Sequence, residues 1–342
     1  MDISLAHLFD RAAIHLVEDS RAFHAAKRAA GGQQGPTNLE ELRKARSSLS
    51  TGAGHGRAGE HVAHAGQGRV PVRVTRPRSG ESGAAYLDIH GGGFLMDSAA
   101  RSDARNARLA DALGVTVVSV DYRLAPEWPW PAAPDDCETA AVWFVEKGRE
   151  LFGTERMVIG GASAGATLAM AALLRLRDRH LVHPIVGAVL QYGAYDLSGQ
   201  SPGGRLYADE WFIQAYAGHV PDRTDPDISP LYGDLGGLPP TLILVGTLDV
   251  LLEDNLAMAA RLSAAGNDVD LRVFPESMHG FTSHPTSMAE AALDGIETWL
   301  ATRLAPAAAR QALHPDLMAP VGADGETCSP APSTDSSPGP SW

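Results

Sequence analysis

The sequence predicts an α/β fold with a mainly parallel sheet that carries helices on both of its faces. Apolar, β-branched runs alternate with alanine-rich helical stretches, which is the pattern of strands joined by right-handed crossover helices. Turns rich in glycine follow two of these runs, as expected at the carboxyl edge of such a sheet. The seven predicted strands are residues 70–74, 85–89, 115–120, 157–159, 185–191, 241–245 and 269–274.

Length and composition allow one large domain with appended segments. The chain has 342 residues, of which 44% are hydrophobic and 20% charged, so a sizeable core can be buried. We expect residues 51–304 to form the main domain and residues 1–50 to form an N-terminal helical cap, to which residues 195–228 contribute. Residues 305–342 are rich in proline, serine and glycine toward their end and are expected to form a disordered tail.

Charge and cysteine content exclude several classes of partner and location. The formal net charge of −13 would repel a polyanion, so we expect no nucleic-acid partner. No window approaches the roughly 18 uncharged apolar residues of a membrane span, and the N-terminus lacks the pattern of a secretory signal. Cys137 and Cys328 are not expected to form a disulfide, and the cytoplasm is the predicted location.

Residues 161–165 have the pattern of a nucleophile elbow, a sharp turn that presents a reactive serine. The segment reads Gly-Ala-Ser-Ala-Gly, and it lies between a predicted strand and a run of good helix formers. Small residues on both sides let the serine adopt a strained backbone with its hydroxyl above the sheet. Because such a pentapeptide is common by chance, the strand, turn and helix around it carry the prediction that Ser163 is a nucleophile.

A glycine run after the predicted strand 85–89 has the composition of an oxyanion hole. Residues 90–94 read His-Gly-Gly-Gly-Phe. Acyl transfer places negative charge on a carbonyl oxygen, and glycines let backbone N–H groups approach that oxygen. We predict the N–H groups of Gly92, Gly93 and Ala164 as the donors, with His90 as a structural anchor of the loop. A loop that needs only positive φ would have the same composition.

An acid and a base should follow the serine in the chain order Ser, Asp or Glu, His. Asp249 and His279 each lie just after a predicted strand, so both should reach the sheet edge that carries Ser163. Their positions select them as orienting acid and general base among many acidic residues and 13 histidines. Glu253 and Asp254 are alternative acids, but they begin the next helix, where the helix dipole favours acidic residues anyway.

Together these motifs resemble those of the hormone-sensitive-lipase family of esterases, also called bacterial family IV. The resemblance extends over about residues 70–300 and includes Asp-Tyr-Arg-Leu-Ala-Pro-Glu at 121–127 and His-Gly-Phe at 279–281. It implies an eight-stranded α/β-hydrolase core with an N-terminal helical cap, no metal and no organic cofactor, and a possible homodimer. It also implies that Tyr122, Arg123 and Glu127 support the oxyanion loop.

Three positions depart from the usual pattern of that family. Ala162 stands where the family has Asp, Ala166 stands where it has a further Gly, and Val250 replaces a common Pro. None of the three is a predicted catalytic residue. The departures therefore bear on rate and subfamily rather than on the class of reaction.

The predicted activity is that of a serine carboxylesterase that hydrolyses small-molecule esters with short- to medium-chain acyl groups. His279 would take the proton of Ser163 during attack, Asp249 would orient the imidazole, and water would hydrolyse the acyl-enzyme. Several large apolar side chains are candidates for the substrate pocket and equally for packing of the cap and core: Phe94, Tyr195, Trp211, Phe212 and Met278.

Two other functions stay open on the sequence alone. A binding protein could keep the pocket without catalysis, as the similar plant gibberellin receptors do by replacing the histidine, whereas His279 is present in this chain. Amide hydrolysis or acyl transfer would use the same three residues as ester hydrolysis. Neither alternative has a sequence feature in its favour.

Overall fold

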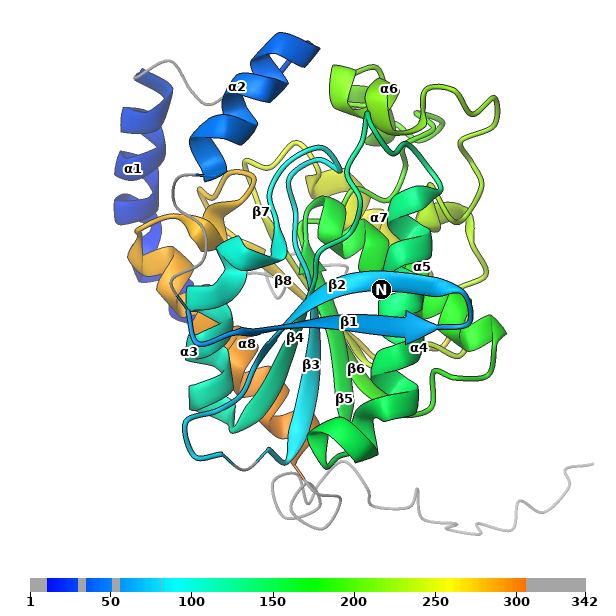
Figure 1. Cartoon of the computed structure of the whole chain (residues 1–342). Helices are drawn as coiled ribbons and strands as arrows, with labels where there is room; N and C mark the ends of the chain where they lie inside the picture. Colours follow the sequence, from blue (N-terminus) through cyan, green and yellow to red (C-terminus); the bar gives the residue numbers. More distant parts are fainter. Residues whose placement is uncertain (1–10, 30–34, 51–55, 81, 306–342) are drawn as a thin grey trace, which may run out of the picture. The chain divides into compact units, whose positions relative to one another are not determined.

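An eight-stranded sheet forms the centre of the computed structural model, with the strand order β1-β2-β4-β3-β5-β6-β7-β8 (Figure 1). The structure describes residues 11–29, 35–50, 56–80 and 82–305. The six strands from β4 to β8 in this order are parallel, whereas β2 pairs antiparallel with both β1 and β4. The sheet is therefore mainly parallel, as predicted.

All seven predicted strands are present, and the structure adds one more. The strands are β1 (Gly59–Ala65), β2 (Gly68–Thr75), β3 (Ala84–Ile89), β4 (Val115–Val120), β5 (Met157–Ala162), β6 (Ile185–Gln191), β7 (Thr241–Gly246) and β8 (Val269–Phe274). β1 is missing from the seven runs recognised in the sequence because most of its side chains are exposed. An edge strand with few buried positions needs no apolar run, so it lacks the main signal of a strand.

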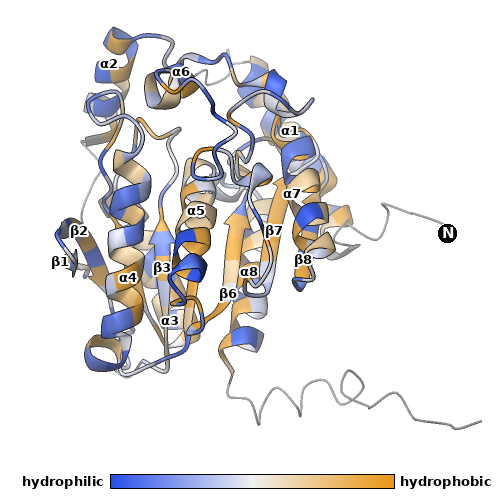
Figure 2. Cartoon of the chain, turned by 90° about the vertical axis from the view of Figure 1, so that its right-hand side faces the viewer, coloured by the Kyte–Doolittle hydropathy of each residue, from blue (hydrophilic) through white to orange (hydrophobic). Residues whose placement is uncertain are grey.

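Helices cover both faces of the sheet and bury its strands on each side. One apolar core lies under α4 (Ala132–Phe152), α5 (Ala164–Asp178) and α7 (Leu252–Ala264). A second core lies under α3 (Asp103–Leu113) and α8 (Ser287–Leu304) on the opposite face. Figure 2 shows β6 and β7 as hydrophobic ribbons among these helices. Strands that are buried on both faces read as continuous apolar runs, which is why the sequence predicts them well.

Short helices gather near the carboxyl ends of the parallel strands (Figure 1). They are α1 (Val17–Ala29) with the preceding 3₁₀ turn (Arg11–Leu16), α2 (Leu39–Ser50) and α6 (Trp211–Ala217). Shorter 3₁₀ turns lie at Ala99–Ser102, Gly204–Leu206, Pro230–Tyr232 and Phe281–Ser283. The helices α1 and α2 belong to the segment 1–50, which is predicted to form the N-terminal cap. Helix α6 belongs to the segment 195–228, which is predicted to contribute to that cap.

The chain divides into two units, residues 1–304 and 305–342. Residues 306–342, which include Cys328 and most of the predicted tail, lie outside the described residues. Cys137 is a buried free thiol, and burial raises its pKa well above the ordinary value. Among the residues that the structure describes, no helix has both the length and the apolar character needed to cross a bilayer.

Candidate active site

Ser163 lies in the sharp turn between β5 and α5, as the elbow pattern predicts. Its backbone has φ 54° and ψ −124°, a conformation that side-chain-bearing residues rarely adopt. The turn depends on small neighbours, since a Cβ on Gly165 would lie 2.0 Å from the carbonyl oxygen of Ile89 and one on Gly161 would lie 2.4 Å from Gly165. Strain of this kind costs about 1–3 kcal/mol and persists only where the surrounding fold enforces it.

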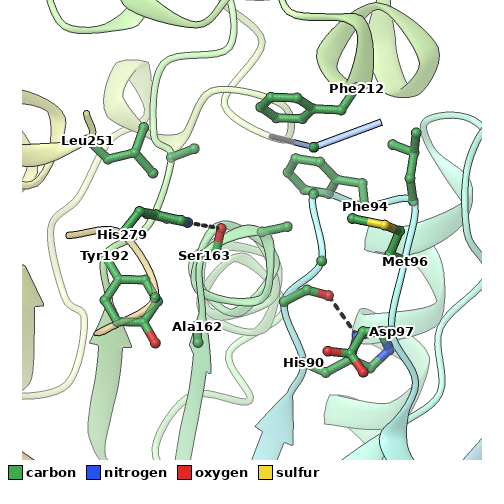
Figure 3. Close-up of a pocket in the computed structure, with 18 of the residues that line it drawn as sticks. His90, Phe94, Met96, Asp97, Ala162, Ser163, Tyr192, Phe212, Leu251 and His279 are labelled. Carbon is green, nitrogen blue, oxygen red and sulfur yellow. Dashed lines mark hydrogen bonds between the residues drawn. The ribbon is translucent and has the colours of Figure 1, made fainter. Parts of the chain in front are cut away.

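The three predicted catalytic side chains meet in one hydrogen-bonded series. Ser163 Oγ lies 2.9 Å from His279 Nε2, and His279 Nδ1 lies 3.0 Å from each carboxylate oxygen of Asp249. Figure 3 shows the imidazole directed at the serine oxygen. The three residues follow β5, β7 and β8, so one edge of a parallel sheet collects them.

Asp249, and neither of the alternative acids, lies against the imidazole. Its side chain has no exposed surface, and Oδ1 also accepts a hydrogen bond from the amide of Leu251 at 2.9 Å. Asp254 instead accepts hydrogen bonds from Tyr207 and from backbone amides, and Glu253 is exposed on α7. A buried carboxylate that accepts from Nδ1–H leaves Nε2 as the acceptor for the serine hydroxyl.

The glycine loop after β3 presents backbone N–H groups beside Ser163. Among the described residues, the amides of Gly92, Gly93 and Ala164 have no hydrogen-bond acceptor. The loop is closed by a tight turn in which the carbonyl of Gly92 accepts from Leu95 at 3.2 Å and from Met96 at 2.9 Å. Free donors at a strand end, next to a helix N-terminus, form an environment that attracts negative charge.

His90 and Tyr122 hold the glycine loop from below. The rings stack with centroids 4.2 Å apart, and the Tyr122 hydroxyl donates to the carbonyls of His90 at 2.9 Å and Gly91 at 3.2 Å. His90 Nδ1 lies 2.8 Å from the carbonyl of Gly91, and burial lowers the pKa of this imidazole. A neutral His90 can donate its Nδ1 proton to that carbonyl, which fits the predicted anchoring role.

The two charged residues expected to support the loop act at a distance from it. Arg123 pairs with Asp136 at 2.7 Å, and its side-chain hydrogen bonds go to Asp136 and to the carbonyl of Ala132. Glu127 pairs at 2.8 Å with Arg46 of α2, which donates to the carbonyls of Leu95 and Ala125. Glu127 thus reaches the loop through Arg46, whereas Arg123 faces Asp136 of α4, and the expected structural support of the loop by these two residues stays a prediction.

A cavity of about 730 Å³ opens above Ser163 and His279. Phe94 and Phe212 line it, as predicted, on the side opposite Tyr192 and Leu251 (Figure 3). The lining also includes Met96, Leu206, Tyr207, Ala162, Val250 and residues 35–37. Apolar walls around a few polar groups are typical of a small-molecule site.

Three predicted pocket residues do not line this cavity. Tyr195 is fully buried within the core, and Trp211, at the start of α6, packs partly buried against that core. Met278 lies toward α1, where its sulfur lies 3.8 Å from Nη1 of Arg28 and its amide lies 3.5 Å from His24. Neighbouring positions in the chain can point to different sides, and residue type alone does not reveal which.

Tyr192 is a residue of the site that the sequence reasoning missed. Its ring meets the imidazole of His279 edge-on with centroids 5.1 Å apart, and its hydroxyl lies 2.6 Å from Thr282 Oγ1. The side chain lines the cavity, and its backbone φ is 41°. Its place directly after β6, at the edge where the other strands deliver their residues, is a signal that could have identified it.

Among the described residues, no three His, Cys, Asp or Glu side chains come together as ligands for a metal ion. The groups that the site presents are a serine hydroxyl, an imidazole paired with a carboxylate, and free backbone donors. This set is suited to nucleophilic attack on a carbonyl carbon.

Comparison with known proteins agrees with this geometry. A family model described as alpha/beta hydrolase fold matches residues 86–283. An ethyl acetate hydrolase of Pseudomonas putida is 36% identical over 227 residues, which are 62% of this chain and 71% of that protein. The carboxylic ester hydrolase LipN of Mycobacterium tuberculosis is 34% identical over 230 residues, or 63% of this chain and 61% of LipN.

A solved structure gives the same result for the fold. A hormone-sensitive lipase from a metagenome library has a TM-score of 0.71 and 30% sequence identity, over 84% of this chain and 99% of that one. Fold, site and relatives thus define a serine ester hydrolase with an α/β-hydrolase fold. The chain belongs to the hormone-sensitive-lipase family of esterases, which confirms the resemblance seen in its motifs and its predicted activity as a carboxylic ester hydrolase.

Proposed function

We propose that the enzyme hydrolyses short- to medium-chain acyl esters through an acyl-enzyme on Ser163, with His279 as general base and Asp249 as orienting acid. The observation that carries the proposal is the unbroken series of hydrogen bonds, 2.9 Å from serine to imidazole and 3.0 Å from imidazole to carboxylate. The first distance is within the range for transfer of the serine proton to the imidazole, and the second is that of a hydrogen bond that orients the imidazole.

The proposed reaction has two steps, acylation of Ser163 and then hydrolysis of the acyl-enzyme, and His279 transfers a proton in each. Ser163 Oγ attacks the ester carbonyl carbon while His279 Nε2 takes the hydroxyl proton, and the buried Asp249 stabilises the imidazolium. His279 then gives this proton to the departing alcohol, which leaves the acyl group on Ser163. In the second step His279 takes a proton from water, and the resulting attack releases the carboxylic acid and restores the serine.

The N–H groups of Gly92, Gly93 and Ala164 hold the oxyanion in this proposal. They have no acceptor among the described residues, so they are available to a ligand without breaking an existing hydrogen bond. Donors that are fixed before the reaction avoid reorganisation when charge develops on the carbonyl oxygen. Loss of one such donor typically lowers kcat about 10²–10³-fold.

The apolar part of the cavity supports short to medium acyl chains. Phe94 is 1% exposed and stacks on Tyr216 with ring centroids 4.0 Å apart, so this wall is rigid. Phe212 packs over Gly93, close to the proposed oxyanion site. Relatives named as an ethyl acetate hydrolase and as acetyl esterases fit the short end of this range.

Replacement of the nucleophile tests the mechanism. Ser163→Ala should lower kcat on p-nitrophenyl butyrate by about 10⁴-fold or more. Without the nucleophile, the enzyme can accelerate the reaction only by binding the substrate and by stabilising the oxyanion. Ser287→Ala is the matched control, since Ser287 is exposed at the start of α8 and outside the cavity. Intact-protein mass spectrometry of the quenched reaction should show the added acyl group on wild type and none on Ser163→Ala.

Other outcomes would point to other functions. Equal activity of wild type and Ser163→Ala would exclude the proposed mechanism. An inert wild type that binds esters would favour a binding protein, and faster cleavage of anilides than of matched esters would favour an amidase. A series of p-nitrophenyl esters from acetate to laurate measures the chain-length preference, which should decline at the long end.

Several predictions rest on the sequence alone and stay predictions. They are the cytoplasmic location, the homodimer, the absence of a nucleic-acid partner, and the division into a cap of residues 1–50, a catalytic domain of residues 51–304 and a tail. Light scattering coupled to size-exclusion chromatography measures the oligomeric state directly.

A further inference from the structure

A positively charged side chain lines the same cavity as the proposed catalytic residues. Arg105 of α3 contributes to the cavity wall together with Ser102, Tyr192, Ser163 and His279. The catalytic chemistry proposed above makes no use of Arg105. A guanidinium inside an otherwise largely apolar substrate cavity therefore calls for an explanation of its own.

The hydrogen bonds of Arg105 leave most of its donors free. Nη2 donates to Asp88 Oδ1 at 2.7 Å and to Ser102 Oγ at 3.2 Å. Within the described part of the chain, Nε and Nη1 have no acceptor. A guanidinium has five N–H donors in a rigid fork, so three of them remain for a ligand.

Asp88, the ion-pair partner of Arg105, has hydrogen-bond donors of its own. Asp88 is buried and also accepts from Asn106 Nδ2 at 3.1 Å and from Ser119 Oγ at 3.0 Å. These neutral donors already stabilise the carboxylate, so Asp88 does not depend on Arg105 alone. The Asp88 charge in turn raises the pKa of Arg105, which keeps the guanidinium protonated at every working pH.

Of the two cavities described here that Arg105 borders, the one that contains Ser163 is the larger. The side chain is 36% exposed although it pairs with a buried aspartate. It borders two cavities, one of about 730 Å³ that contains Ser163 and one of about 40 Å³ beneath it, which Asp88 also lines. The smaller cavity holds little more than one water molecule, whose share of liquid volume is about 30 Å³.

Two carboxylates also border the large cavity, and neither one neutralises Arg105. Asp97 forms an ion pair with Arg101 at 3.0 Å. Glu210 is exposed, precedes α6 and makes no ion pair with Arg105 among the described residues. On the part of the cavity wall that α3 forms, the charged group with free N–H donors is therefore the guanidinium of Arg105.

We propose that Arg105 forms an anion subsite in the substrate cavity, and that the enzyme favours esters that carry a free carboxylate, such as monoesters of dicarboxylic acids. The guanidinium would receive the remote carboxylate of the ester through its free Nη1–H donors, while Ser163 attacks the ester carbonyl. A hydrogen bond between a guanidinium and a carboxylate is charge-assisted and about twice as strong as a neutral one. This inference rests on the proposed ester hydrolysis at Ser163.

The test compares charged esters with neutral esters of the same length. Monoethyl succinate, glutarate and adipate are measured against ethyl butyrate, valerate and caproate in a pH-stat. For at least one pair, kcat/KM of the wild type should favour the charged ester about 10- to 100-fold, as expected for a charge-assisted pair. A second arm compares carboxymethyl acetate with propyl acetate, and shows whether the carboxylate is recognised on the alcohol side.

Variants of Arg105 assign the preference to this residue. Arg105→Gln should remove the preference, because it should raise KM for charged esters much more than KM for the neutral esters of the same length. Arg108→Gln is the matched control, one helical turn along α3, where Arg108 pairs with Asp294 and Glu297. Arg105→Lys keeps the charge but not the fork, so it should retain only part of the preference.

A measurement on the wild type alone also tests the subsite, so the test does not depend on whether the Arg105 variants fold. Succinate should inhibit hydrolysis of p-nitrophenyl acetate by the wild type more strongly than butyrate does. Equal kcat/KM for charged and neutral esters in both arms, or a preference that survives in Arg105→Gln, would overturn the subsite. Failure of the proposed function looks different, since the wild type would then hydrolyse neither kind of ester.

Discussion

Gly92 and Gly93 show how single backbone positions shape the proposed oxyanion hole. Gly92 has φ 103°, and a Cβ there would lie 2.2 Å from the carbonyl oxygen of Met96. Gly93 has φ 62°, and a Cβ there would meet only the ring of Phe212, at an ordinary 3.5 Å. The turn that aims the amides therefore tolerates a side chain at Gly93 much better than at Gly92.

This contrast gives a prediction at the residue scale. Gly92→Ala should lower kcat on p-nitrophenyl butyrate about 10²–10³-fold, because the loop must move away from Met96 and the donors move with it. Gly93→Ala should cost much less, about 10-fold, since a left-handed backbone costs a side chain about 1–2 kcal/mol. Thermal unfolding is followed in parallel, and a Gly92→Ala enzyme with wild-type kcat would contradict the proposed role of the loop.

At the scale of elements, α7 holds the segment that follows β6 in place. Asp254 of α7 accepts hydrogen bonds from the Tyr207 hydroxyl at 2.6 Å, from the amide of Asp196 at 3.2 Å and from the amide of Tyr195. Burial raises the pKa of this carboxyl to about 6. Tyr207 lines the substrate cavity, so this helix supports part of the cavity wall.

Removal of one hydroxyl tests this connection. Tyr207→Phe should lower the free energy of unfolding by about 1.5–3 kcal/mol near pH 7.5, because it removes a buried hydrogen bond to a charged group. Tyr232→Phe is the control, since the Tyr232 hydroxyl donates to Asp196 at 3.1 Å from a residue that is 37% exposed. Urea denaturation measures both variants. A Tyr207→Phe loss no larger than that of Tyr232→Phe would show that Asp254 does not anchor the segment.

At the scale of the whole described fold, α1 joins the loop that carries His279. Ser20 donates to the carbonyl of Glu276 at 2.7 Å, and Lys27 Nζ lies 3.0 Å from His284 Nε2. Burial, and then the charge of Lys27, lower the pKa of His284 to about 4. The same two effects, together with the charge of Arg28, lower the pKa of His24, which is 1% exposed. The contact between α1 and the catalytic loop therefore requires neutral imidazoles.

The stability of the protein should consequently fall in mild acid. An imidazole with a depressed pKa contributes fully above its ordinary pKa of 6.5, and this contribution is lost as the pH falls toward about 4, because the unfolded chain then binds more protons. Asp254 acts in the opposite direction below about pH 6, where the folded chain takes up its proton first. The two titrations can be separated by changing one group at a time.

A histidine variant measures this pH dependence. His284→Gln should flatten the fall of Tm between about pH 7 and pH 5, since it removes one of the protons that unfolding takes up. His64→Gln serves as control, because His64 is exposed on β1. Differential scanning calorimetry over this range provides the values. An unchanged slope in His284→Gln would mean that the contact with α1 does not depend on a neutral imidazole.

Much of the fold follows from local sequence pattern. Strands buried on both faces, such as β4 and β7, require continuous apolar runs, and these runs predict them to within one residue. The sequence predicted that Ser163, Asp249 and His279 lie near one another, because chemistry and chain order restrict such residues to strand ends. β1 escaped recognition because an exposed edge strand needs few apolar residues. The sequence did not indicate that Arg123 pairs with Asp136, because a charged side chain does not reveal which carboxylate it contacts in the fold.

What the sequence determined by itself is the order of strands and turns, and with it the residues that reach the carboxyl edge of the sheet. Only the tertiary structure decided which side chains face the cavity: it turned Tyr195 into the core and Met278 toward α1, and it placed Arg105 of α3 in the wall of the cavity that contains Ser163. The physical reason is the distance along the chain over which each kind of interaction acts. Backbone conformation and apolar periodicity act between near neighbours in the chain, whereas the walls of a cavity and the pairing of buried charges depend on contacts between distant segments.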